Sequence, residues 1–346
     1  MIIQSRWRVR PRFFVFLMTL MVILIWLIFG HAGFSHAPNT SQARPKLLTV
    51  HRTSLPVSCL THYPAFALPF PLKDIQSITL GNNILVAGTS RDNSHPQGVS
   101  YAISPGGLVQ GPSLSLPPGG ALLISQNMTW WAGGITHNTP GTSAINLQSH
   151  QTLSNFLPVA LSNAGVAVTS RASFLVGGNS DSGFSARIYE LSSSNGTIQN
   201  WGLLPQAVKD PTVQVGNNML VVAGGILPNG SMNSSVWIYQ LSSHHLINTL
   251  QLPYGIWGAQ MVYLQHHFWL LGGETSPHHL LSTIWVITSH SLILTTAHLP
   301  TGLTQFAAGI MNHQIWIIGG VTPGGPTATI RVLKLIVNAS HPQASS

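Results

Sequence analysis

The chain has 346 residues, of which 44% are hydrophobic and only 6% are charged, and its formal net charge is +8 at pH 7. The single cysteine, Cys59, excludes an intrachain disulfide, a four-cysteine zinc site and a cysteine-held iron–sulfur cluster. The positive charge comes from scarce acids and not from a basic stripe, because four of the fourteen Lys and Arg residues lie within residues 1–12 and the others form no run. We therefore expect no nucleic-acid partner.

The N-terminal segment predicts a membrane anchor. Residues 1–12 contain four arginines and no acid, and an apolar run of 18 residues, Phe13–Gly30, follows directly. A run of this length can cross a bilayer as a helix. We expect a cytoplasmic basic N-terminus over 1–12 and a transmembrane signal-anchor over 13–32, with the rest of a single-pass protein outside the cytoplasm by the positive-inside rule. Cleavage after Ala32, which would release a secreted protein, is the alternative.

Two segments lack any periodic pattern. Residues 33–62 are rich in Pro, Ser, Thr and His, which predicts a flexible linker between the membrane and the folded domain. Residues 338–346 are small and polar, and we expect them to form a disordered tail. The folded domain is accordingly expected over residues 63–337.

Between these segments the chain repeats itself six times, and two markers define the repeat. One is an apolar run that ends in a glycine pair, and the other is a Leu-Pro dipeptide about twenty residues before each run. The runs are Ile84–Gly88, Trp130–Gly134, Phe174–Gly178, Leu220–Gly225, Phe268–Gly273 and Ile315–Gly320, with Thr89 replacing the second glycine in the first repeat. The Leu-Pro pairs begin at Leu68, Leu116, Leu157, Leu204, Leu252 and Leu299. The shared period of about 46 residues predicts propeller blades of four strands.

Each repeat provides four candidate strands, which we call A to D from the axis outward. The A strands are short, small and apolar, as suits a crowded centre, and polar Gly/Asn/Gln/His turns join them to the glycine-ended B strands. The D strands end near the Leu-Pro pairs, because proline is tolerated on a free outer edge. We therefore expect an all-β, six-bladed propeller that is monomeric.

The two ends of the chain are expected to close the ring. The sixth repeat has no D strand of its own after residues 330–337, whereas Tyr63–Pro71, ahead of the first A strand, carries a Leu-Pro pair. We predict that residues 64–68 pair with residues 330–336 and complete the sixth blade. An irregular lead-in is the alternative.

The repeats resemble those of the kelch family, in which a glycine pair follows four apolar residues and aromatic residues occupy the next two strands. The third repeat matches most fully, with Gly177, Gly178, Tyr189 and Trp201. The second and sixth repeats lack the aromatic residue of strand C, so the likeness concerns the architecture. Kelch propellers mostly bind macromolecules, and a few are enzymes such as galactose oxidase or sialic acid mutarotases. The resemblance implies a scaffold without choosing between these classes.

Catalytic and metal-binding sets are difficult to assemble. The six carboxylates lie in different repeats, and Asp74 and Asp210, although on one face, are placed on nearly opposite blades, so solvated loop charges are the expectation. Adjacent histidines, as in His278-His279, point to opposite sides of a strand. Cys59 precedes the propeller, which excludes the copper radical site of galactose oxidase. We expect no catalytic residues, no metal site and no cofactor.

Two function classes remain open. The first is a membrane-tethered, extracytoplasmic scaffold that binds a protein or a cell-surface glycan, and the second is an exported sugar-active enzyme of the kelch mutarotase or lyase kind. We favour binding, on the face built from the B–C and D–A loops. The candidate binding residues are Tyr254, Trp257, Gln260, His278, His279 and Gln305. Trp257 has the alternative role of a core residue that caps the end of the ring.

The scarcity of acids also suggests an acidic exterior. A fold whose polar faces are neutral loses little when carboxylates become protonated. Simple compositional bias is the other explanation.

Overall fold

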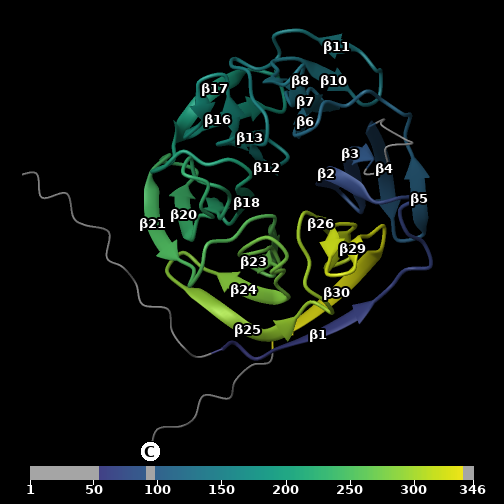
Figure 1. Cartoon of the computed structure of the whole chain (residues 1–346), viewed down its shortest axis with the longest axis vertical. Coiled ribbons are helices and arrows are strands. Elements are labelled where there is room, and N and C mark those ends of the chain that lie inside the picture. The colour runs from purple at the N-terminus through teal and green to yellow at the C-terminus, as the bar shows by residue number, and fades with distance from the viewer. Residues whose placement is uncertain (1–53, 91–97, 338–346) are drawn as a thin grey trace, which may run out of the picture. The chain divides into compact units, whose positions relative to one another are not determined.

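The computed structural model describes residues 54–90 and 98–337, and these form an all-β, six-bladed propeller (Figure 1). Six four-stranded antiparallel sheets surround a central axis, and the described residues contain no helix. None of the described residues belongs to a helix that could cross a membrane. The predicted anchor over 13–32 and the tail over 338–346 lie outside the described residues.

The blades follow one another along the chain, and the strands of each blade are named from the innermost to the outermost. Blade 1 contains β2 (Leu72–Leu80), β3 (Asn83–Ser90), β4 (Gly98–Ser104) and β5 (Gly107–Gln110), and blade 2 contains β6 (Ala121–Ser125), β7 (Met128–Ala132), β10 (Ala144–Asn146) and β11 (Thr152–Leu153). Blade 3 contains β12 (Gly165–Val168), β13 (Ala172–Val176), β16 (Arg187–Ser192) and β17 (Ile198–Leu203), and blade 4 contains β18 (Thr212–Gly216), β19 (Met219–Ala223), β20 (Ser235–Gln240) and β21 (Leu246–Gln251).

The last two blades complete the circle. Blade 5 contains β22 (Gln260–Leu264), β23 (His267–Leu271), β24 (Thr283–Ile287) and β25 (Leu292–His298), and blade 6 contains β26 (Ala307–Met311), β27 (Gln314–Ile318), β30 (Ile330–Val337) and β1 (Val57–His62). Three of the connections between second and third strands form small hairpins of their own: β8 (Ile135–Thr136) with β9 (Thr139–Pro140), β14 (Asn179–Ser180) with β15 (Gly183–Phe184), and β28 (Val321–Thr322) with β29 (Gly325–Pro326).

The predicted turns between the first and second strands are confirmed in blades 2, 4, 5 and 6. Each places two successive residues in the left-handed region, which gives the twist that a two-residue hairpin requires. The pairs are Gln126-Asn127, Asn217-Asn218, Gln265-His266 and Asn312-His313. Asn tolerates this conformation better than most residues do, because its short polar side chain can bond locally.

The hydrophobic core consists of six clusters, one at each interface between neighbouring blades. Trp131, Trp237 and Trp269 on the second and third strands are almost fully buried in these interfaces. A buried aromatic side chain removes a large apolar area from water. Stability therefore comes mainly from blade-to-blade packing, and each blade depends on both of its neighbours.

The glycine pairs allow neighbouring blades to approach each other closely. Gly177 and Gly178 have φ values of 65° and 95°, and a Cβ atom on Gly177 would collide with the carbonyl oxygen of Val208 in the connection to the next blade. The Gly178 N–H donates a hydrogen bond of 2.8 Å to that same oxygen. Equivalent bonds join Gly134 to Leu161, Gly225 to Ile256 and Gly273 to Leu303. The glycine pair that marks these repeats thus forms a hydrogen bond between neighbouring blades.

The ring is closed by the N-terminal part of the described chain, as predicted, but by a different segment. Strand β1 pairs antiparallel with β30 from Val57–Val337 to His62–Val332, and the two strands lie side by side in Figure 1. The prediction of a strand over residues 64–68 was wrong, and 57–62, expected within the linker, supplies it. The Leu-Pro pair lies in the connection after the outer strand, where the Leu68 N–H bonds to the Ala328 oxygen at 2.9 Å.

A second contact fastens the closing strand to the neighbouring blade. Leu55 donates its N–H to the Leu294 oxygen at 2.9 Å and accepts a bond from the Thr296 N–H at 3.0 Å, so the chain is bound to β25 just before it enters blade 6. Val57 is only 4% exposed and packs into the cluster between blades 5 and 6.

We predict that the chain folds stably when it starts at residue 54 but not when it starts at residue 63. Loss of Val57 from the core costs roughly 1.5–3 kcal/mol, and β30 becomes an unpaired edge. Thermal unfolding should show a clearly lower midpoint and aggregation for the shorter protein. Leu60→Ser serves as the control, because Leu60 is 59% exposed and its replacement should change stability by no more than about 0.5 kcal/mol. Equal midpoints for the two lengths would contradict this role of β1.

Candidate functional site

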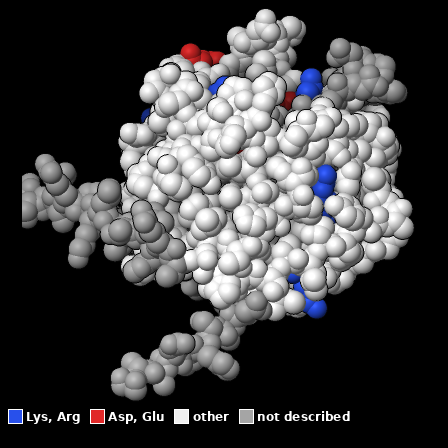
Figure 2. Space-filling model, turned by 60° about the horizontal axis from the view of Figure 1, so that its bottom comes forward, with Lys and Arg blue, Asp and Glu red and all other residues white. Residues whose placement is uncertain are grey.

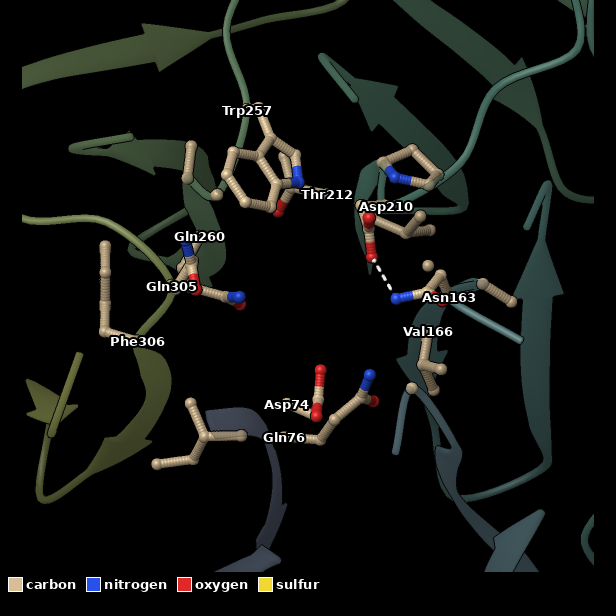
Figure 3. A pocket seen from close by; sticks show the side chains of 18 of the residues that line it. Asp74, Gln76, Asn163, Val166, Asp210, Thr212, Trp257, Gln260, Gln305 and Phe306 are labelled. Atoms are coloured by element: carbon tan, nitrogen blue, oxygen red, sulfur yellow. Dashed lines mark hydrogen bonds between the residues drawn. The ribbon is translucent and has the colours of Figure 1, made fainter. Parts of the chain in front are cut away.

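A cavity of about 170 Å³ opens at the centre of the ring, where the connections from outer strands enter the inner strands (Figure 3). Its walls include the carboxylates Asp74 and Asp210, the amides Gln76, Asn163, Gln260 and Gln305, and the indole of Trp257. A second cavity of about 110 Å³ continues along the axis and shares Ser77, Val166, Val213 and Gln260 with the first. The axis of the propeller is therefore hollow and mostly polar in this region.

One position of the repeat supplies four of the polar side chains that form the rim of the cavity. The six equivalent residues are Asp74, Gly119, Asn163, Asp210, Gly258 and Gln305, which recur at intervals of 44 to 48 residues and all line the cavity. Each has a left-handed backbone, with φ between 50° and 69°. This conformation turns the chain sharply into the inner strand. It also explains why Gly, Asn and Asp are common at the position.

Backbone hydrogen bonds fix this rim from both sides. Asn163 donates its N–H to the Gly119 oxygen at 2.7 Å, Asp210 donates to the Asn163 oxygen at 2.8 Å, and Gln305 donates to the Gly258 oxygen at 2.8 Å. Just upstream of these residues, the carbonyl groups that accept bonds from the glycine pairs belong to Leu161, Val208, Ile256 and Leu303. The cavity is thus built on backbone that the contacts between blades hold in place.

Asp210 is bound by the side chain of the neighbouring position of the rim. Its Oδ1 accepts a hydrogen bond of 3.0 Å from the Asn163 side-chain amide (Figure 3). Burial raises the pKa of Asp210 above its ordinary value, and repulsion from Asp74 adds to this rise. Hydrogen bonds from Asn163 and Trp257 and the charge of Lys209 act in the opposite direction, and burial outweighs them. The carboxylate is therefore held in one orientation in a site where its charge is partly desolvated.

Asp74 and Gln76 approach the cavity from the opposite side of the ring (Figure 3). A bulge of β2 between Lys73 and Gln76 interrupts the pairing with β3, and Asp74 within it has a left-handed conformation with φ of 50°. Thr89, which replaces the second glycine of the first repeat, donates a long hydrogen bond of 3.4 Å to Asp74 Oδ2. The two carboxylates thus belong to blades 1 and 4 and face a common space.

Trp257 projects over the same space from the connection between blades 4 and 5. Its backbone N–H and carbonyl both pair with Glu274, at 3.0 and 2.8 Å. Glu274 is only 7% exposed, and this burial raises its pKa, while the charge of His278 lowers it. The backbone of Trp257 is therefore held in place by its pairing with Glu274. The indole forms part of the cavity wall and does not belong to a core cluster.

The structure brings together half of the candidate binding residues. Trp257, Gln260 and Gln305 line the cavity. Tyr254 lies outside it, half-buried against the core between blades 4 and 5. His278 and His279 are exposed on the connection from β23 to β24, where His279 Nδ1 lies 2.6 Å from the Thr275 hydroxyl. Three of the six predicted residues therefore line the candidate site, and the other three do not.

Asp74, Asn163 and Asp210 were absent from the predicted binding set. The sequence places the two acids on one face and nearly opposite each other, and in the structure this arrangement directs both into one cavity. The expectation of a solvated loop charge was wrong for Asp210, because the site partly desolvates it. Aligning the repeats on the position that lies two residues before the inner strand in blades 2 to 6, and at the bulge of β2 in blade 1, would have found all three. Among the described residues, no three His, Cys, Asp or Glu side chains come close enough to hold a metal ion.

The raised pKa values predict that mild acid stabilises the protein through Asp210 and Glu274. The folded state binds these protons more tightly than the unfolded state does, so the contribution grows as pH falls through the raised values and levels off below the ordinary values of about 4. Asp210→Asn should therefore unfold at a higher temperature than the wild type at pH 7, and the difference should narrow towards pH 4. Asp181→Asn, at an exposed position, is the matched control. An Asp210→Asn protein less stable than the wild type at pH 7 would contradict the burial argument.

Comparison with known proteins identifies the fold of the chain but does not assign it to a family. No family model matches the chain, and no curated protein sequence does so. A solved structure described as "Structure of YjhT" superposes with a TM-score of 0.66 over 79% of this chain and 99% of its own, at 14% identity. At this identity the likeness shows a shared propeller fold alone. A propeller of this kind serves as a binding scaffold or as an enzyme.

Proposed function

We propose that the protein is a membrane-tethered, kelch-like propeller that binds a glycan outside the cytoplasm, with the central cavity as its recognition site. The tether is the apolar segment over 13–32, and its flanking arginines support a cytoplasmic N-terminus. The observation that carries the proposal is the lining of the cavity. Carboxylates, amides and one indole converge on a space at the axis of the ring.

These side chains suit a polyhydroxylated ligand. Gln76, Gln260 and Gln305 each offer both a donor and an acceptor, and the carboxylates add further acceptors for hydroxyl groups. Trp257 provides an apolar surface on which the C–H face of a sugar ring can stack. The centre of a protein interface would instead be expected to be poor in charged and rich in aromatic side chains, whereas this lining has two carboxylates and one indole.

The dimensions favour one protruding residue of a larger ligand. The cavity of about 170 Å³ is smaller than the roughly 300–1,000 Å³ usual for sites that enclose a drug-sized molecule. It opens at the face formed by the connections between blades, so the remainder of a glycan chain can extend across that face. The cavity would then bind the terminal sugar, while the surrounding face makes weaker contacts with the rest of the glycan.

Substitution of the lining should separate binding from folding. We expect Trp257→Ala to weaken binding of a glycan identified from an array by about thirtyfold or more, because truncating a central aromatic anchor typically costs about 2 kcal/mol or more. Gln260→Ala and Gln305→Ala should each weaken binding less. The measurement is calorimetric titration of the detergent-solubilised full chain, with thermal unfolding to establish that the variants fold.

Variants outside the cavity define the extent of the binding face. Tyr254→Ala and His278→Ala should weaken binding only where the glycan extends across the connections beside blade 5. Glu190→Gln serves as the control, because this carboxylate lies on β16 and accepts a hydrogen bond from Gln199 on the outer strand β17. Unchanged affinity in the Trp257→Ala protein, with its fold intact, would refute the cavity as the binding site.

The pair of carboxylates supports a second candidate function, that of a sugar-active enzyme. Asp210 has a raised pKa and Asp74 repels it across the cavity, and two acids in different environments are a common basis for acid–base catalysis. If the protein turns over a sugar, Asp210→Asn should abolish proton transfer and retain ligand binding. Nuclear magnetic resonance of anomer exchange or product formation in bound sugars measures this directly. Exchange at the uncatalysed rate with the wild-type protein would eliminate the enzyme.

A further inference from the structure

We propose that the face of the propeller opposite the cavity binds the anionic phospholipid surface of the membrane, and that protonation of its histidines in mild acid strengthens this contact. The inference rests on the membrane tether of the proposed function but concerns the other end of the ring. This turn face is formed in blades 4 to 6 by residues 241–247, 265–267, 288–291 and 312–313 and by the end of β30, 334–337. Docking there directs the cavity away from the bilayer.

The direction of the strands places both ends of the described propeller at this face. First strands run from the cavity to the turn that precedes the second strand, and third strands run the same way. In blade 6, the start of β1 pairs with the end of β30 through Val57 and Val337. Residues 31–53 separate Ser54 from the apolar run that ends at Gly30. A flexible segment of this length spans roughly 25–30 Å, so the tether holds the turn face near the bilayer and weak lipid contacts suffice.

Histidines supply most of the cations of the turn face. Its turns carry His244, His245, His266, His267, His290 and His313. All of them except His267 are exposed, and the exposed Lys334 near the end of β30 adds a permanent charge. Histidine gains a positive charge as the pH falls from about 8 to about 5, so an acidic medium adds several charges to this one face. Each basic group near anionic lipid strengthens the attraction, and lipid phosphates accept hydrogen bonds from charged donors.

One acid lies close to these histidines. Within the part of the chain that the structure describes, Glu190 is the only acid near the turn end of its blade, two residues before the end of β16, and it accepts a hydrogen bond of 2.7 Å from the Gln199 amide. It shares a flank of blade 3 with Ile188 and Trp201, which pack against blade 4. The His244 ring stacks on this Trp201 indole, with 4.7 Å between the ring centres. His244 is therefore the one histidine of the face that is unsuited to a charge test.

The other titratable groups at this end leave the positive charge in place. Arg171 on the first turn of blade 3 is exposed and adds to it. Burial raises the pKa of the Cys59 thiol on β1 and of the Tyr239 phenol on β20, so both stay neutral in mild acid. The Tyr263 ring on β22 packs against Phe268. Figure 2 shows Lys, Arg, Asp and Glu as isolated spots on the side of the described residues that it presents, so the histidines can dominate the local charge.

Exposed apolar side chains accompany the histidines. Four of them, each between 37% and 46% exposed, lie at strand ends on the turn face: Leu246, Ile247, Ile336 and Val337. The Asn248 side chain donates a hydrogen bond of 2.8 Å to the Ser289 oxygen, which joins the outer turns of blades 4 and 5 into one surface. Apolar side chains beside cations suit the headgroup region of an anionic bilayer, whereas a soluble polyanion offers nothing to the apolar ones.

The fold does not require histidine at these turns. His266 and His313 have left-handed backbones with φ of 63° and 56°, and the equivalent residues of blades 2 and 4 are Asn127 and Asn218. Asn tolerates this conformation and carries no charge, so a change from His to Asn removes the charge and keeps the turn. Such variants therefore test lipid binding and leave the ring intact.

The experiment measures which end of the ring meets the bilayer. The full chain with Cys59→Ala carries a fluorophore at Ser243→Cys, on the turn face, or at Ser276→Cys, on the connection at the cavity end. It is reconstituted in vesicles of phosphatidylcholine, alone or mixed with phosphatidylglycerol, that contain a headgroup quencher. Time-resolved fluorescence then gives the ratio of docked to free propellers. From pH 7.5 to pH 5, we expect this ratio to rise at least about tenfold for the turn-face label in the anionic vesicles only.

Matched histidine variants identify the source of the effect. His266→Asn, His290→Asn and His313→Asn together should lower the docked-to-free ratio at pH 5 at least about tenfold, because three charges leave the face. The control removes three exposed histidines from the cavity end of the blades and should dock as the wild type does: His62→Asn, His137→Asn and His298→Asn. Thermal unfolding establishes that both triple variants fold.

The outcomes separate the inference from the function on which it rests. Equal quenching at the two labelled positions overturns docking by the turn face but leaves the tether in place. A chain that does not float with the vesicles in a density gradient has no tether, which overturns both. A rise that persists in the turn-face variant shows that these histidines are not its cause. Quenching that inorganic polyphosphate abolishes at equal phosphate concentration assigns the face to a soluble polyanion, and docking that grows with protein density in uncharged vesicles assigns it to a second copy of the chain; either result overturns lipid binding.

Discussion

The structure depends on one close approach, that of a carbonyl group to the glycine pair at the end of the second strand in blades 2 to 5. In blade 3 the Val208 oxygen lies where a side chain on Gly177 would be, and it accepts the Gly178 N–H at 2.8 Å. Any other residue would move this carbonyl, and with it the connection to the next blade. Because the same bond recurs at Gly134, Gly225 and Gly273, the blades are spaced by backbone contacts and the core clusters fill the space between them.

This constraint also positions the site. The carbonyl groups that the glycine pairs bind lie two residues before the cavity rim, as with Val208 and Asp210, so rim and ring are held by the same set of bonds. Side chains at the rim can then vary from repeat to repeat with little effect on folding, since the left-handed backbone is fixed by its neighbours. Asp74, Asn163 and Gln305 occupy one structural position with three different chemistries. A propeller of this design separates stability from recognition.

The sequence predicted the blades well because their markers are backbone requirements that recur at a fixed period. The Leu-Pro signal led to the wrong closing strand, since Leu68 bonds in the connection after the strand and the strand itself, Val57–His62, has no marker of its own. Asp74 and Asp210 were expected on one face but on nearly opposite blades, which separates them by half the ring. The two side chains meet at the axis because the blades form a closed ring. In the sequence, only alignment of the repeats shows that Asp74 and Asp210 occupy the same position of their blades.

The scarcity of charge gives the two carboxylates their significance. A fold that makes its polar surfaces from Ser, Thr, Asn and Gln has no general need of acids, and burial of Asp210 costs free energy that a neutral Asn or Gly at the same position would avoid. Natural proteins tolerate such a cost mainly at functional sites, where the group interacts with something other than the fold. The equivalent glycines of blades 2 and 5 show that the ring closes without a side chain at this position. The function of Asp74 and Asp210 is therefore to be sought in what enters the cavity between them.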